Sequence, residues 1–192
     1  MPAILIAITL HELAHGYMAY QLGDPTAYED GRLTLNPISH IDIVGFLLLF
    51  IVGFGWAKPV PINPRYFKKR KIGTLLVSLA GPVTNFILAL FSAIIFVSGI
   101  IENNIILSML RPLIFINIAL GVFNLLPFPP LDGSKIVASL LPNKLEYLFY
   151  KYEKYLYLIL ILLVLTNNIE RILGPLVQIS FNTLNDILNM IF

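Results

Sequence analysis

Two histidines four residues apart, His11 and His15, could bind one metal ion together. Positions i and i+4 of an α-helix lie on the same face, so the two imidazoles can reach a single ion. Glu12 directly follows the first histidine, and from there its carboxylate can reach a water molecule on that ion. The His-Glu-x-x-His spacing is typical of zinc-dependent hydrolysis, in which the histidines hold the metal and the glutamate acts as general base.

A third ligand must come from elsewhere in the chain, because catalytic zinc usually has three protein ligands and one open position. The sequence has no cysteine, so any metal must be held by His, Asp or Glu, and His40 and Asp132 are the candidates for the third ligand. Asp132 follows a proline-rich stretch and precedes a glycine, although an Asp-Gly pair alone indicates only a turn. His40 could equally be a loop histidine held by local hydrogen bonds, so the residues leave both candidates open.

The composition indicates a membrane protein. Hydrophobic residues make up 57% of the chain and charged residues 12%, whereas soluble domains carry about 45–50% apolar and about 25% charged residues. The apolar residues form long runs, which favours an all-α polytopic membrane protein. Ionisable side chains inside such runs are costly and functional by default, which strengthens the metal-site interpretation.

The apolar runs predict five to six membrane segments. The expected segments are residues 3–22, 43–57, 72–101, 105–126, 155–166 and 172–192. Segment 43–57 is short for a span, which favours a re-entrant segment.

The stretch between the first two segments, residues 24–42, is polar and rich in turn residues. Arg-Leu-Thr-Leu at 32–35 alternates in polarity, which predicts a short strand or β-hairpin after the first helix.

Basic residues predict the topology. Residues 58–71 contain Lys and Arg but no acidic residue, so this stretch is expected on the cytoplasmic side and in contact with lipid headgroups rather than nucleic acid. If 43–57 is re-entrant, His11, His15 and Asp132 then fall at a similar depth on that side. Trp56 is expected to anchor the chain at the interface.

Three motifs together resemble the site-2 proteases, the zinc metalloproteases that cleave within membranes. They are His-Glu-Leu-Ala-His at 11–15, Gly-Pro-Val-Thr-Asn at 81–85, and Asn-Leu-Leu-Pro-Phe-Pro-Pro-Leu-Asp-Gly at 124–133. The stretches 31–37 and 54–60 are similar to the compact prokaryotic branch of that family. The resemblance covers about residues 3–140, whereas the remainder is generic membrane helix.

The resemblance implies one Zn²⁺ per chain, bound by His11, His15 and Asp132, with Glu12 as the base. It also implies that Asn85 and Asn124 bind substrate or stabilise the oxyanion. Asn85 could instead form a polar contact between helices at a kink caused by Gly-Pro.

The expected organisation is a single membrane-embedded metalloprotease domain over residues 1–192, without a PDZ-like or other regulatory domain. Residues 3–140 form its core and 141–192 add accessory membrane helices. The expected location is the plasma membrane of a prokaryote, as a multi-pass protein, and the basic residues predict an active site toward the cytoplasm.

The expected activity is zinc-dependent endopeptidase cleavage within or near transmembrane helices of substrate proteins, in contact with the lipid bilayer and without nucleic acid. A membrane metal-ion transporter and a catalytically silent scaffold that binds membrane helices are the alternatives. The sequence does not indicate the oligomeric state.

Overall fold

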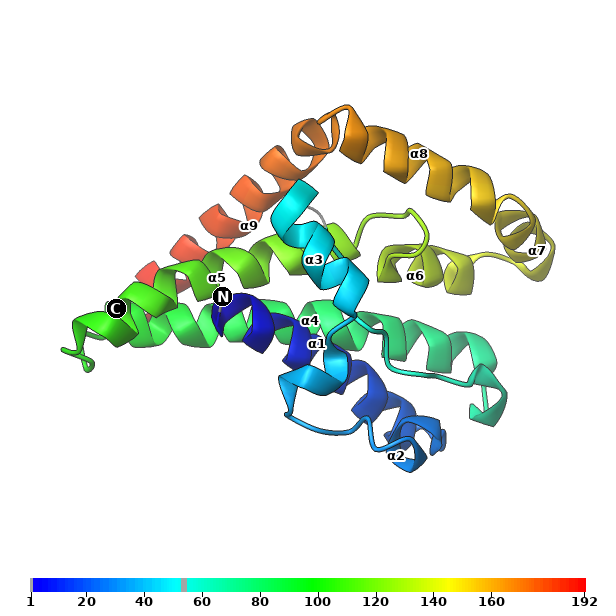
Figure 1. Ribbon diagram of the computed structural model, residues 1–192, viewed down its shortest axis with the longest axis horizontal. Coiled ribbons are helices and arrows are strands. Elements are labelled where there is room, and N and C mark those ends of the chain that lie inside the picture. The colour runs from blue at the N-terminus through cyan, green and yellow to red at the C-terminus, as the bar shows by residue number, and fades with distance from the viewer. Residues whose placement is uncertain (1, 53–54) are drawn as a thin grey trace.

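The computed structural model describes residues 2–52 and 55–192, and within these residues every regular element is a helix (Figure 1). The long helices are α1 (Pro2–Gln21), α4 (Arg70–Val97), α5 (Asn104–Asn124) and α9 (Ile169–Ile191). The shorter ones are α2 (Thr26–Glu29), α3 (Ile43–Val52), α6 (Asp132–Leu140), α7 (Asn143–Lys151) and α8 (Glu153–Leu165), with 3₁₀ turns η1 (Pro37–His40) and η2 (Pro64–Tyr66). The expected all-α class is confirmed.

Helix α4 lies at the centre of the molecule and contacts α1, α5 and α6 (Figure 1). Its buried face is built largely from small residues, among them Gly73, Ser78, Ala80, Gly81, Ala89, Ser92 and Ala93. Small side chains allow neighbouring helix backbones to approach closely. This face therefore brings α1, with its two histidines, directly against α4.

The core beside α4 is apolar and joins distant parts of the chain. Ala89 and Ala93 of α4 pack with Ile114 and Ile118 of α5 and with Leu184 of α9. A second cluster joins the end of α5 and the following loop to α8 and α9. These contacts fix α5, and hence the loop that leads to Asp132, relative to α4.

Only two described helices, α4 and α5, are long and apolar enough to cross a membrane. Helices α8 and α9 qualify as a third span only if they are counted together, although they are bent by 86° where they meet. The expectation of five to six membrane segments is therefore wrong by this criterion. Helix α3 has 10 residues, whereas a span needs about 20, and polar residues in the second half of α1 lower its hydropathy.

The expected β-hairpin is not present in the described residues. Residues 31–36 form turns and bends, and the nearest β-type pairing is an isolated antiparallel bridge between Ile41 and Ala57. Alternation over only four residues is a weak strand signal, and here Gly31 with φ +62° and the 3₁₀ turn at Pro37 bound it at both ends. Too few residues lie between Gly31 and Pro37 to form a paired strand.

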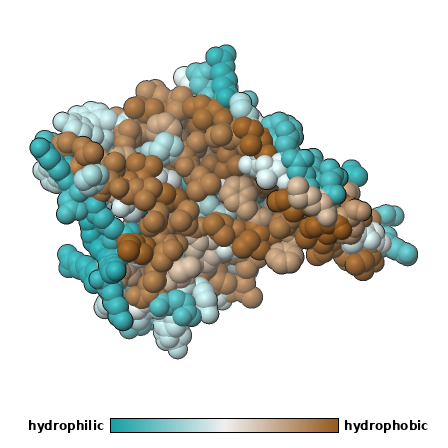
Figure 2. Space-filling model, turned by 180° about the vertical axis from the view of Figure 1, so that it is seen from behind, coloured by the Kyte–Doolittle hydropathy of each residue, from teal (hydrophilic) through white to brown (hydrophobic). Residues whose placement is uncertain are grey.

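The apolar run 43–57 forms α3, while residues 53 and 54, which this expectation also covered, lie outside the described part of the chain. Ile43, Leu47 and Ile51 on α3 are more than half exposed. Figure 2 shows that hydrophobic residues cover much of one face of the molecule, with hydrophilic residues gathered at its edges. A re-entrant path for this run stays a prediction.

Candidate metal centre

Helix α1 presents His11 and His15 from consecutive turns of one face toward α4. Both histidines are buried, with 5% and 6% of their surfaces exposed. Their Nε2 atoms are 3.0 Å apart, and the rings meet edge to face at 85°. The spacing of four residues along the helix thus gives two convergent imidazole nitrogens, as the sequence predicts.

Asp132 completes a triangle with the two histidines. Its Oδ2 lies 3.2 Å from Nε2 of His11 and 3.0 Å from Nε2 of His15, and the residue is buried. The other oxygen, Oδ1, lies 3.5 Å from Nζ of Lys135, one turn along α6. The structure therefore brings together three possible metal ligands from distant parts of the chain, all of them named from the sequence.

The position of Asp132 depends on its neighbour Gly133 at the start of α6. A Cβ atom on Gly133 would lie 2.2 Å from the carbonyl oxygen of Leu125 and 2.3 Å from that of Leu126. Only glycine lets α6 begin so close to the end of α5. The Asp-Gly pair thus delivers a carboxylate to the histidines from a tightly packed helix start.

The outer nitrogen of each imidazole is bound to an oxygen atom of α4. Nδ1 of His11 donates to Oδ1 of Asn85 over 2.6 Å, and Nδ1 of His15 donates to the carbonyl oxygen of Val77 over 2.7 Å. The amide of Asn85 donates to two other oxygens, which establishes its Oδ1 as the acceptor. Both protons therefore sit on Nδ1, and both Nε2 lone pairs face the centre of the triangle.

The three converging atoms fit a zinc ion. Two neutral Nε2 atoms and a carboxylate oxygen are all acceptors, and acceptors held about 3 Å apart without a donor repel one another unless a cation lies among them. A tetrahedral zinc ion with bonds of about 2.0–2.2 Å separates its ligand atoms by about 3.3–3.5 Å. The separations of 3.0, 3.0 and 3.2 Å are close to that geometry.

Gly81 of α4 forms one wall of the site. A Cβ atom on this residue would lie 2.5 Å from Nε2 of His15 and 2.7 Å from Nε2 of His11. No side chain fits there unless the ligands move. The sequence motif at 81–85 pointed to this region, but that the glycine backbone touches the metal ligands is visible only in the fold.

Behind His11, two buried asparagines form a hydrogen-bonded chain. The amide of Asn85 donates to Oδ1 of Asn117 on α5 over 2.8 Å and to the carbonyl oxygen of Ala7 over 3.3 Å. Asn117 in turn donates to the carbonyl oxygen of Leu113 over 2.8 Å. Both amides are fully buried, so this chain of contacts favours a role in orienting His11. The substrate or oxyanion role of Asn85 stays a prediction.

The carboxylate of Glu12 is partly exposed beside the ligands and is held by one backbone group. Its Oε2 accepts a hydrogen bond of 2.9 Å from the N–H of Val60. Val60 is buried and lies between Pro59 and Pro61, which have no N–H. A single amide donor therefore positions the expected base, and sequence reasoning missed it.

Two other residues named from the sequence lie apart from the three ligands. Asn124, at the end of α5, donates to the carbonyl oxygen of Leu120 over 3.1 Å, and its expected contact with substrate stays a prediction. His40 is fully buried in η1 and donates from Nε2 to the carbonyl oxygen of Thr34 over 2.9 Å. Among the described residues, the cluster of possible metal ligands contains His11, His15 and Asp132 but not His40.

The model of peptidase family M50 matches residues 96–166, a stretch that includes Asp132 but not the histidine motif at 11–15. A provisionally named zinc metalloprotease of Bacillus subtilis, YwhC, is 38% identical over 200 residues, which cover 98% of this chain and 90% of the relative. The zinc metalloprotease MJ0392 of Methanocaldococcus jannaschii is 30% identical over 76% of this chain and 35% of the relative.

A third relative, provisionally named zinc metalloprotease Rip2 of Mycolicibacterium smegmatis, is 28% identical over 93% of this chain and 71% of the relative. No solved structure matches the chain. Because the aligned region covers 98% of this chain, it spans the histidine motif as well as the position of Asp132. The chain therefore belongs to peptidase family M50 and is a zinc metalloprotease, as its resemblance to the site-2 proteases implies.

Proposed function

We propose that this protein is an intramembrane zinc endopeptidase that hydrolyses peptide bonds within or near transmembrane helices of substrate proteins. One observation carries the proposal: the buried triangle of His11, His15 and Asp132 is packed against α4, a helix long and apolar enough to cross a membrane. A hydrolytic site in this position meets polypeptides that lie in the bilayer.

Zinc bound by the three ligands supplies Lewis acidity for the scissile carbonyl and for water. Glu12 takes a proton from the attacking water and returns it to the leaving amine. The N–H of Val60 holds one carboxylate oxygen of Glu12, which leaves the other oxygen for this proton transfer. Asn85 and Val77 keep the imidazoles in the tautomer whose Nε2 atoms can bind a metal.

The substrate must unwind locally before cleavage, because a helix hides its carbonyl groups in hydrogen bonds. Residues 55–63 contain no helix, Ala57 among them pairs in an antiparallel bridge with Ile41, and the N–H of Val60 in this stretch donates to Glu12. We propose that the unwound substrate lies alongside this stretch by strand addition. Pro59 and Pro61 offer only carbonyl groups to such a partner, so the substrate would supply the donors.

The proposed organisation is a single domain over residues 1–192, with its core in 3–140 and accessory helices in 141–192. We place the protein in the plasma membrane of a prokaryote as a multi-pass protein, with the metal centre toward the cytoplasm. The basic stretch 58–71, which leads into α4, supports this orientation.

The test uses the purified chain in proteoliposomes with a model single-span substrate. Glu12→Gln is expected to retain stoichiometric zinc but to abolish cleavage, whereas His11→Ala is expected to lose zinc as well. Cleavage by Glu12→Gln at the wild-type rate would rule out the proposed mechanism. Zinc flux across the vesicles without substrate cleavage would favour a transporter instead.

A further inference from the structure

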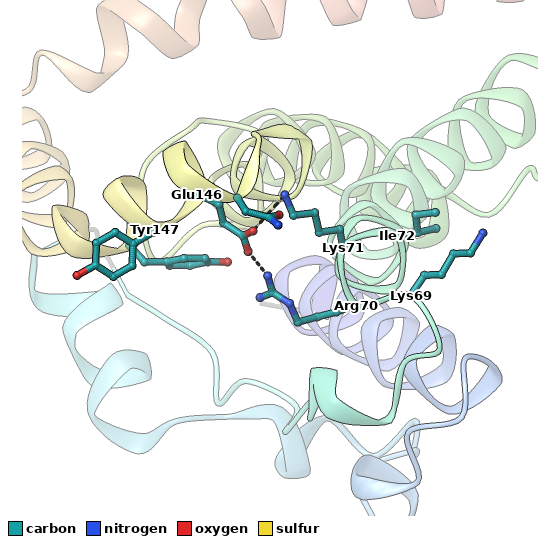
Figure 3. A pocket seen from close by; sticks show the side chains of 8 residues that line it. Lys69, Arg70, Lys71, Ile72, Glu146 and Tyr147 are labelled. Atoms are coloured by element: carbon teal, nitrogen blue, oxygen red, sulfur yellow. Dashed lines mark hydrogen bonds and ion pairs between the residues drawn. The ribbon is translucent and has the colours of Figure 1, made fainter.

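An open surface cavity that contains several charged side chains lies where α4 begins and α7 packs beside it (Figure 3). Its volume is about 660 Å³. Residues at the start of α4 and along α7 line it, including Lys69, Arg70, Lys71, Asn143, Tyr147 and Tyr150. The lining holds three cationic side chains and one carboxylate, that of Glu146, so the cavity has a net positive charge.

Glu146 fixes two of the cations before any ligand arrives. Its Oε1 lies 2.5 Å from a guanidinium nitrogen of Arg70, and its Oε2 lies 3.2 Å from Nζ of Lys71. Burial alone would raise the pKa of Glu146, but the hydrogen bonds from Arg70 and Lys71 hold it below its ordinary value. Figure 3 shows both cations directed at this carboxylate from α4. The side chains of Arg70 and Lys71 are thus already ordered in the free protein, which lowers the entropy lost when a ligand binds.

Arg70 retains most of its hydrogen-bonding capacity. A guanidinium has five N–H donors in a planar fork, and the hydrogen bond to Glu146 uses one of them. The side chain is 56% exposed, and the exposed tyrosines Tyr147 and Tyr150 line the same cavity. A cavity that contains a guanidinium fork and is also lined by hydroxyl groups suits a phosphate, which accepts hydrogen bonds from both kinds of group.

The position of the cavity indicates a lipid rather than a soluble anion. Arg70 is the first residue of a helix long and apolar enough to cross a membrane, and such a span would place its guanidinium near the headgroups. Ile72, two residues further on, is 51% exposed and also lines the cavity. The basic cavity therefore opens next to an apolar surface.

The opposite face of α7 supports the same conclusion. Leu145, Leu148 and Phe149 line a second, almost wholly apolar groove of about 680 Å³, together with residues at the start of α8. A helix with a basic cavity on one face and an apolar groove on the other is suited to lie in the membrane interface. Hydrophilic residues also gather at the edge of the molecule in Figure 2 where α4 begins.

We propose that this cavity, which Tyr147 and Tyr150 also line, binds the phosphate of an anionic phospholipid, with Arg70 as the main hydrogen-bond donor. A bound headgroup would brace the start of α4, the helix that carries Val77, Gly81 and Asn85 against the histidines. The proposal does not rest on proteolysis, because lipid binding is measured without zinc or substrate.

The experiment counts lipids retained by the full chain, released from micelles into a native mass spectrometer, during titration with phosphatidylglycerol or phosphatidylcholine. Wild type is expected to retain one phosphatidylglycerol at concentrations where no phosphatidylcholine is bound. Arg70→Lys keeps the charge next to Glu146 but loses the fork, so the affinity is expected to fall by about fivefold or more. Tyr147→Phe combined with Tyr150→Phe tests the hydroxyl groups without changing charge.

The matched control is Arg171→Lys, the same change at an exposed arginine of α9, which is expected to retain the lipid like wild type. Equal losses in Arg70→Lys and Arg171→Lys would mean diffuse attraction and would overturn the proposal. Equal retention of phosphatidylcholine would also overturn it. Displacement of phosphatidylglycerol by an equimolar amount of inorganic phosphate would show an anion site without lipid specificity and would overturn the choice of a lipid.

Discussion

Gly81 lies so close to His15 that a single methyl group cannot be placed between them: a Cβ atom on Gly81 would be 2.5 Å from Nε2 of the histidine. Contacts under about 3 Å between non-bonded carbon and nitrogen atoms are strongly repulsive. The backbone of α4 therefore acts as a fixed wall for the metal centre, and the ligand geometry depends on a residue that binds no metal.

Gly81→Ala is expected to weaken zinc binding by about 10- to 100-fold, in the range found when groups that orient metal ligands are lost. The added methyl group must displace His11 or His15 from the triangle, because both nitrogens lie within 2.7 Å of it. Zinc affinity is measured by competition with a chelator. Gly174→Ala is the matched control. Gly174 also lies inside a helix, α9, but a Cβ atom there meets nothing within 4 Å. Unchanged zinc affinity in Gly81→Ala would contradict the observed packing.

Asn85→Ala is expected to destabilise the protein and to weaken zinc binding, because it leaves Nδ1 of His11 and Oδ1 of Asn117 buried without partners. A buried polar group without a hydrogen bond costs about 1–3 kcal/mol. Zinc affinity and the thermal unfolding midpoint are measured together. Asn182→Ala removes an exposed asparagine amide from α9 and should change neither quantity. If Asn85→Ala lowers cleavage alone, with zinc affinity intact, a direct role with substrate is favoured instead.

The three metal ligands were predicted from the sequence on different grounds. His11 and His15 lie on one helix, so their convergence follows from helix geometry alone. Asp132 is distant in sequence, and only the distribution of basic residues and the motif resemblance placed it on the same side. The contacts made by Gly81 and Asn117 could not be predicted in this way, because each depends on how α4 packs against α1 and α5.

The membrane segments were over-predicted because an apolar run does not show where a helix ends. The run 155–166 forms α8, which ends at Leu165, and the next helix departs at 86°. The run 43–57 likewise gives a helix of only 10 residues. Hydropathy shows that a run avoids water, but it does not fix the length or the direction of the helix that the run forms.

Val60→Pro tests the single backbone donor that holds Glu12. The change removes the N–H that donates to Oε2, in a stretch that already contains Pro59 and Pro61. A hydrogen bond to a charged group contributes about 1.5–3 kcal/mol, so kcat is expected to fall by roughly 10- to 100-fold while zinc content stays at one per chain.

Val60→Ala is the matched control, because it shortens the side chain but keeps the N–H, and its kcat should remain near that of wild type. Equal kcat values for Val60→Pro and Val60→Ala would show that the amide does not position the base. Loss of zinc in Val60→Pro would instead indicate that the stretch supports the ligands.

The contact of Glu146 with Arg70 and Lys71 makes the packing of α7 on α4 sensitive to acid. Burial would raise the pKa of Glu146, but the two cations hold it below its ordinary value of 4.5. A carboxylate with a lowered folded-state pKa stabilises the fold above its ordinary pKa, and that contribution is lost as the pH falls through the lowered value. The midpoint of thermal unfolding of wild type should therefore exceed that of Glu146→Gln by about 2–4 °C at pH 7. The difference should shrink below about pH 4.5.

Glu153→Gln, which removes an exposed carboxylate from α8, should follow wild type throughout. A difference between wild type and Glu146→Gln that persists unchanged to pH 3 would show that the side chain acts through its shape rather than its charge.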